Sequence, residues 1–177
     1  MTTTIIASDA EVRAWMAGAT AFRRPLKPRG ICAACMSDAV PHPAVDGRLT
    51  AYLRVGACEH NGVTGKRVVA PWEPGDVLRV REAHRFSVSD GTPKAIIQYR
   101  ADGAGLALMH ADEGNGDLVG VGPAMEPADW GDNGPAWRSA ATMPAWASRM
   151  SIRVTGVGIE RDGDGWMWVV TFERVTP

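Results

Sequence analysis

The fold is organised around Trp72-Glu73-Pro74-Gly75-Asp76-Val77-Leu78-Arg79-Val80-Arg81-Glu82. Its first half is typical of a turn, because Pro74 fixes one backbone angle and Gly75 tolerates a positive φ. The valine and leucine residues that follow favour an extended strand. The strand ends in Arg81-Glu82, an adjacent pair of opposite charges. Taken alone, this pattern indicates a core strand with a solvated charged end, and the rest of the chain suggests a binding site there.

The composition indicates one globular domain over residues 1–177, with irregular insertions near residues 30–47 and 103–135. Apolar residues make up 45% of the chain and charged residues 22%, which suits a folded core. The net charge of −1 excludes a bulk basic field for nucleic acid, so such binding would need a local patch. No apolar run is long enough for a membrane span, and the N-terminus does not resemble a signal peptide. We therefore expect a cytoplasmic protein with no membrane partner.

One short helix and several strands are expected. Ser8 and Glu11 are spaced as a capping box, and the apolar stripe that follows predicts a helix over residues 9–17. Alternating residues predict a strand over 48–55, and Ala95–Arg100 predicts another. Asp162-Gly163-Asp164-Gly165 predicts a hairpin turn between strands at 151–160 and 166–175, with a bulge at Gly156. The fold class is therefore mainly β, with long irregular insertions.

Two further clusters have alternative interpretations. Four cations and two prolines fall within residues 23–29, which fits either a solvated loop or an anion-binding edge. Three cysteines and one histidine could form a structural zinc site, or they could be ordinary reduced side chains. His84 could sit in a pocket beside Glu82 or be structural. No other cofactor is expected. The candidate zinc ligands are Cys32, Cys35, Cys58 and His60.

The order of these segments resembles the ASCH family, and in particular members carried by phages and prophages. The resemblance rests on the turn and strand at 74–82, on the terminal Trp168–Val175 and on five other pieces. These pieces are Met16-Ala17-Gly18, Thr20-Ala21-Phe22-Arg23-Arg24, Tyr99-Arg100-Ala101-Asp102-Gly103, Trp137-Arg138 and Met143-Pro144-Ala145-Trp146-Ala147-Ser148-Arg149. It implies a PUA-like mixed β-barrel whose cleft takes nucleic acid or a modified nucleoside. A phage origin would place the protein in the host cytoplasm.

The resemblance also bears on catalysis. A bacterial member similar to this chain hydrolyses N4-acetylcytidine with a lysine and a threonine after the first helix, and with a glutamate from a helix between the last two strands. Ala19 stands at that lysine position and Phe22 at that threonine position, while residues 160–165 form a tight turn in place of the helix. The ligand-binding residues that the resemblance leaves are Thr20, Arg23, Arg24, Arg81 and Glu82.

Three functions remain open at the level of sequence. The first is binding of a nucleic acid or nucleotide without turnover, in a cleft that Arg23, Arg24 and Arg81 approach and that has Glu82 at its floor. The second is an amidohydrolase of a modified nucleoside with relocated catalytic groups, for which Glu82 and His84 are the candidates. The third is a scaffold that binds a host protein.

Overall fold

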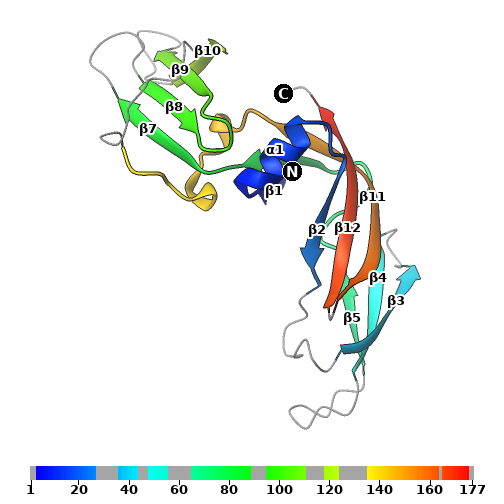
Figure 1. Cartoon of the computed structure of the whole chain (residues 1–177). Helices are drawn as coiled ribbons and strands as arrows, with labels where there is room; N and C mark the ends of the chain where they lie inside the picture. The colour runs from blue at the N-terminus through cyan, green and yellow to red at the C-terminus, as the bar shows by residue number, and fades with distance from the viewer. Residues whose placement is uncertain are drawn as a thin grey trace. The chain divides into compact units, whose positions relative to one another are not determined.

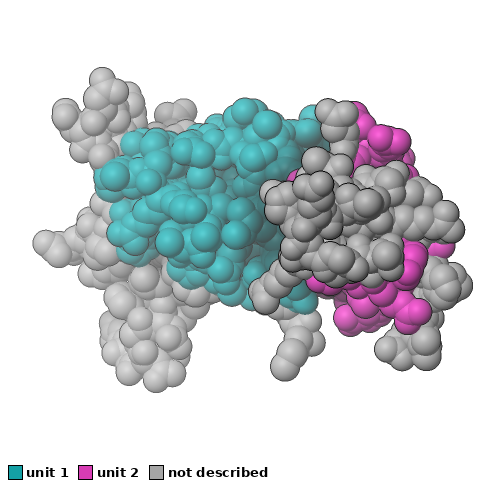
Figure 2. Space-filling model, turned by 90° about the horizontal axis from the view of Figure 1, so that it is seen from below, with its two compact units in different colours: residues 1–19, 79–151, 176–177 teal, residues 20–78, 152–175 magenta. Residues whose placement is uncertain are grey.

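The computed structural model describes residues 3–26, 36–43, 48–55, 65–88, 95–110, 118–123, 135–163 and 165–175. These residues form a mainly β protein with three sheets. They divide into two compact units, shown in Figure 2. Unit 1 comprises residues 1–19, 79–151 and 176–177, and unit 2 comprises residues 20–78 and 152–175. None of the described helices is long and apolar enough to cross a membrane.

The largest sheet has five strands in the order β1-β6-β11-β12-β2. The turn and strand expected at 72–82 are confirmed, because Gly75 has a φ of 97° and β6 follows at once. The predicted terminal hairpin is also confirmed, since β11 and β12 are neighbours joined by a short turn. The bounds of these strands are Thr3–Ile6 for β1, Val77–Arg81 for β6, Ser151–Asp162 for β11, Gly165–Val175 for β12 and Ala21–Pro25 for β2.

Helix α1 (Asp9–Met16) has the capping box that the sequence predicts. Ser8 Oγ accepts a hydrogen bond from the Glu11 main-chain N–H at 3.3 Å, and the Glu11 carboxylate accepts one from the Ser8 N–H at 2.9 Å. Val12 and Trp15 are buried, whereas Met16 is exposed, so the buried stripe is narrower than expected. The helix is followed by Gly18, whose φ is 104°.

Unit 1 contains a four-stranded antiparallel sheet whose strands lie side by side in the order β10-β9-β8-β7 (Figure 1). Its strands are β7 (His84–Val88), β8 (Ala95–Tyr99), β9 (Gly105–His110) and β10 (Leu118–Pro123). Two short 3-10 helices, η3 (Ala140–Thr142) and η4 (Ala145–Ala147), follow in the chain. The expectation that 103–135 is irregular is wrong for β9 and β10, because main-chain pairing forms a ladder where side-chain periodicity is weak.

Unit 2 contains a three-stranded antiparallel sheet in the order β3-β4-β5. Its strands are β3 (Met36–Pro43), β4 (Leu49–Val55) and β5 (Gly65–Val69). The expectation that 30–47 is loop-like is wrong for β3, although that strand contains Pro41 and Pro43. Among the described residues β3 pairs only with β4. Because alternate residues direct their N–H groups to the same side, both prolines can face the unpaired side of this strand.

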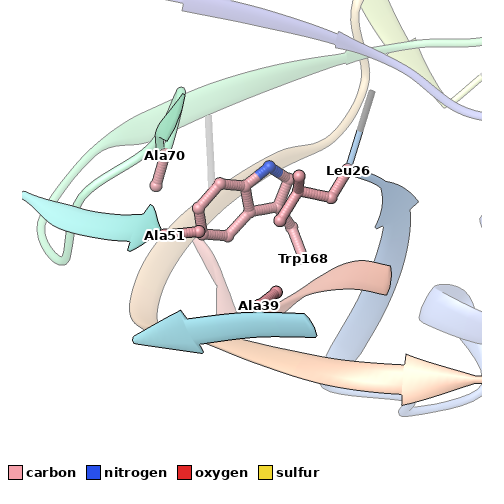
Figure 3. Packing of buried hydrophobic residues seen from close by; sticks show 5 residues of the cluster. All are labelled: Leu26, Ala39, Ala51, Ala70 and Trp168. Carbon is pink, nitrogen blue, oxygen red and sulfur yellow. The ribbon is translucent and has the colours of Figure 1, made fainter. Parts of the chain in front are cut away.

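The core of unit 2 is built around Trp168 of β12, which is 4% exposed. Figure 3 shows its indole surrounded by Leu26 and by alanines from the neighbouring strands. Small residues at these positions leave space for the large ring, so one bulky side chain fills the volume that several medium ones would take. The alanines are Ala39, Ala51 and Ala70.

Gly156 of β11 permits a close approach to the partner strand. A Cβ at this position would lie 2.7 Å from Thr171 Oγ1 on β12, a distance that real Cβ contacts do not reach. The neighbouring Thr155 and Thr171 hydroxyls are 3.1 Å apart across the same pair of strands. The absence of a side chain at Gly156 therefore lets Thr171 of β12 approach β11 closely. The predicted bulge at this residue stays a prediction.

Candidate functional site

Arg149 joins two carboxylates in unit 1. Its Nε and Nη2 donate to the two Glu82 oxygens at 2.8 and 2.9 Å, and its Nη1 and Nη2 donate to Asp102 at 2.8 and 2.9 Å. Glu82 directly follows strand β6 and is buried, with only 1% of its side chain exposed, and its main-chain N–H donates to the Met143 sulfur at 3.2 Å. The Tyr99 ring lies under the guanidinium, 4.2 Å from its carbon, and donates its hydroxyl to the Ala147 carbonyl at 2.8 Å.

Burial and pairing oppose each other in the pKa values of this cluster. Burial alone would lower the pKa of Arg149, but the hydrogen bonds to Glu82 and Asp102 outweigh it and raise that pKa. Burial alone would raise the pKa of Asp102, but hydrogen bonds from Arg149 and from the Ala104 N–H lower it overall. Burial raises the pKa of Tyr99. The charged forms of Arg149 and Asp102 are thus favoured by their pairing.

His84 begins β7 and pairs with Arg138 through the main chain. The Arg138 N–H donates to the His84 carbonyl at 2.7 Å, and the His84 N–H donates to the Arg138 carbonyl at 3.3 Å. The two side chains line a cavity of about 140 Å³ together with Phe86, Ile97, Thr142 and Pro144. His84 is 2% exposed, and its Nδ1 has no hydrogen-bond partner within the described residues. A buried, unpaired imidazole nitrogen in a cavity is a feature that a ligand could satisfy.

The imidazole is biased toward its neutral form. Burial lowers the pKa of His84, the main chain of Glu82 acts in the opposite direction, and the positive charge of Arg138 lowers the pKa further. A neutral imidazole can donate or accept at Nδ1, depending on its tautomer. The arrangement therefore suits a group that changes its protonation when a ligand binds.

A second cavity, of about 490 Å³, lies in unit 1 and also has Arg138 in its wall. Trp137 lines it with 40% of its surface exposed, and the Arg85 guanidinium lies 4.7 Å from the centre of the indole ring. Arg100 also lines it and is paired with Asp9. Within the described residues, the Arg138 guanidinium has no hydrogen bond or ion pair. The remaining lining residues are Ala7, Ser8, Ala83, Ser139 and Ala140.

Alternation along the strands explains this construction. His84, Phe86 and Ile97 lie on one face of the β7–β8 pair, since His84 is opposite Tyr99 and Phe86 is opposite Ile97. Arg85 and Gln98 lie on the other face and are joined by a 2.6 Å hydrogen bond. One strand pair thus forms the wall of the small cavity on one face and orients Arg85 beside Trp137 on the other.

The predicted ligand-binding residues fall in both units. Thr20, Arg23 and Arg24 belong to unit 2, where Arg23 pairs with Glu160 at 3.2 Å and Arg24 lies 5.0 Å from the centre of the Phe22 ring. In unit 1, Arg81 Nη1 donates to the Ala141 carbonyl at 3.2 Å.

The charge partner of Glu82 is Arg149, whereas the sequence suggested Arg23, Arg24 and Arg81. That a single cleft gathers those three arginines stays a prediction.

The candidate zinc ligands Cys32, Cys35, Cys58 and His60 lie outside the described residues. Among the residues that are described, no group of three or more His, Cys, Asp or Glu side chains could hold a metal ion. Zinc binding by the four residues stays a prediction.

Three residues of this site were not singled out from the sequence as functional. Trp137 and Arg138 were quoted only as a matching pair, and their adjacency, an aromatic ring beside a cation, was the available signal. Arg149 gave no local signal, because its partner Glu82 is 67 positions away. No protein-family model, curated protein or solved structure matches the chain.

Proposed function

We propose that the protein is a phage-type member of the ASCH family, with a PUA-like β-barrel, that binds a nucleic acid or a nucleotide without turnover. The mainly β fold, the capped first helix and the turn before β6 agree with this proposal. The proposal does not require the strongly basic surface of a nonspecific nucleic-acid-binding protein, because a local site would provide the contacts.

The observation that carries the proposal is the exposed Trp137 ring at the larger cavity, next to the Arg138 guanidinium, which has no ion pair among the residues that the structure describes. Stacking of a base on an aromatic ring contributes about 1–3 kcal/mol per base. A guanidinium binds phosphate oxygens through two parallel hydrogen bonds. The Arg85 guanidinium lies over one face of the indole and restrains it, so less side-chain freedom is lost when a base stacks on the other face.

Turnover is not expected, because the candidate catalytic carboxylate is already engaged. Both Glu82 oxygens accept hydrogen bonds from Arg149 and the side chain is 1% exposed, so a general base at this position would first have to be released from that pair. Phe22, at the family's threonine position, is 4% exposed and packs edge-on against Trp72 at 5.4 Å between ring centres. These contacts are those of structural residues, for Glu82 as well as for Phe22.

Calorimetric titration with nucleotides and short single strands tests this proposal. Trp137→Ala should weaken binding about 5- to 150-fold, which corresponds to the loss of one stacked base. Arg138→Ala should weaken it and lower the slope of log affinity against log salt by close to one unit. Arg153→Ala is the matched control, because Arg153 is an exposed arginine of unit 2 paired with Glu173. Full affinity in both test variants would refute this site.

The double variant Arg23→Ala with Arg24→Ala separates this site from the arginine rim expected from sequence. If those arginines contact phosphates, the double variant should weaken binding and flatten the salt dependence. Unchanged affinity and slope, together with loss of binding in Arg138→Ala, would assign the ligand to unit 1 alone.

The second candidate function is hydrolysis of an acylated nucleoside, and the unpaired His84 Nδ1 is the observation that favours it. A neutral imidazole in a cavity can serve as a general base. Release of acetate from N4-acetylcytidine that disappears in His84→Gln would support this function. No release by the wild-type protein would leave binding alone.

A further inference from the structure

The side chains of His84 and Arg138 are held close together by their main chains. Each residue both donates to and accepts from the other, which is the arrangement of a hydrogen-bonded antiparallel pair. In such a pair the Cα atoms are about 5.5 Å apart and the two side chains lie on the same face. The imidazole and the guanidinium therefore share one cavity because of local backbone geometry.

This cavity has space for a small group, and within the described residues nothing forms a hydrogen bond with His84 Nδ1. Its volume of about 140 Å³ corresponds to roughly four or five water molecules. Phe86, Ile97 and Pro144 provide apolar walls, while Thr142 already donates its hydroxyl to the Ser139 carbonyl at 2.8 Å. A buried polar atom without a partner is destabilising. A ligand atom that bonds to His84 Nδ1 would remove this cost.

We infer that His84 and Arg138 together bind an oxyanion of the ligand, and that its binding takes up one proton from solvent onto His84. The inference rests on the proposed function, since it assigns the phosphate of the proposed nucleotide to this pair while the base stacks on Trp137. The guanidinium supplies a permanent positive charge. The protonated imidazole supplies a second N–H donor and a second positive charge.

The surrounding charges decide the direction of the proton linkage. An oxyanion between the two groups neutralises the Arg138 charge that lowers the pKa of His84, so that pKa should rise on binding. The other ionisable groups near the imidazole are already paired or point elsewhere. These are Tyr99, opposite His84 on β8; Glu82, bound to Arg149; Asp102, bound to the same arginine; and Arg85, on the other face of β7.

Inorganic sulfate is the probe for this inference, because it stays a dianion where a phosphate monoester itself titrates near pH 6. Wild-type protein should bind sulfate more tightly as pH falls from about 8 to 5, by at most tenfold per pH unit for one linked proton. Calorimetry in two buffers of different ionisation enthalpy should show net proton uptake near pH 6.5. The imidazole signals of His84 in an NMR titration should shift to higher pKa with sulfate present.

Two variants separate the parts of the pair. Arg138→Gln should lose sulfate binding, while His84→Gln should keep weaker binding that no longer depends on pH. Arg153→Gln, a change in the exposed pair with Glu173, is the control and should behave as wild type. The wild-type protein alone can overturn the inference, even if no variant folds. It would do so if its sulfate affinity did not depend on pH and sulfate left the His84 titration unshifted.

The outcomes also separate this inference from the proposed function. Nucleotide binding that depends on Trp137 but involves no proton uptake would refute the inference and leave the proposed function standing. Sulfate binding with proton uptake, in a protein that binds no nucleotide, would support the inference and refute the proposed function.

Discussion

Replacing Arg149 with methionine is expected to destabilise unit 1 strongly. The change leaves the Glu82 carboxylate, 1% exposed, without the two hydrogen bonds and the charge that offset its burial. Removing one partner of a buried ion pair costs about 3–5 kcal/mol. For a chain of this size, such a loss lowers the melting temperature by roughly 6–20 °C. Thermal and urea unfolding followed by circular dichroism would measure it.

The matched control is Arg153→Met, which breaks a pair of the same residue types and the same 2.8 Å distance. Its two side chains are about half exposed, so its loss should cost only about 0–1 kcal/mol. A double variant, Arg149→Met with Glu82→Gln, should recover part of the lost stability because the fully buried carboxylate at position 82 is replaced by a neutral amide, leaving only the more exposed Asp102 without its partner. If the Arg149 and Arg153 variants lost the same free energy of unfolding, the argument that burial makes the Arg149–Glu82 pair indispensable would be refuted.

Three other outcomes are expected. Gly156→Ala should lower the free energy of unfolding by about 1 kcal/mol, because the new methyl group must displace the Thr171 hydroxyl. Gly158→Ala should be tolerated, because a Cβ there would lie 3.9 Å from its nearest atom, and melting curves of the two variants test both expectations. Because the pKa of His84 is lowered in the folded state, the unfolded chain binds more protons, and stability should fall as pH drops below about 6.5. A flatter curve of stability against pH for His84→Gln would confirm His84 as the source, and a curve identical to that of the wild-type protein would exclude it. If the three cysteines and His60 bind zinc, elemental analysis of purified protein should find about one ion per chain, and metal-free protein would contradict the prediction.

Local patterns predicted the parts of the fold that depend on neighbouring residues. The Gly75 turn, the Ser8 capping box and the terminal hairpin each need only a few consecutive side chains, and each is present in the structure. Strand β3 was missed because its two prolines indicate a loop unless the pairing of that strand is known. Strands β9 and β10 were missed because main-chain pairing, which leaves little trace in side-chain pattern, defines them.

The candidate site was predictable only in part, for a related reason. The sequence directed attention to Glu82 and His84, and both are buried in unit 1. It did not identify Arg149 or the special position of Arg138, since both depend on contacts between distant segments. Main-chain hydrogen bonds between His84 of β7 and Arg138 place the guanidinium beside the imidazole, and nothing near His84 in the sequence predicts that contact.

The two prolines of β3 also affect how the protein behaves at high concentration. An unpaired strand presents N–H and C=O groups that a strand of another molecule can bind, and this pairing begins many aggregates. Proline has no N–H group, so Pro41 and Pro43 remove two donors from β3. A second molecule would therefore find an incomplete ladder there. Within the described residues, the prolines that made β3 resemble a loop in the sequence therefore also limit pairing along its unpaired edge.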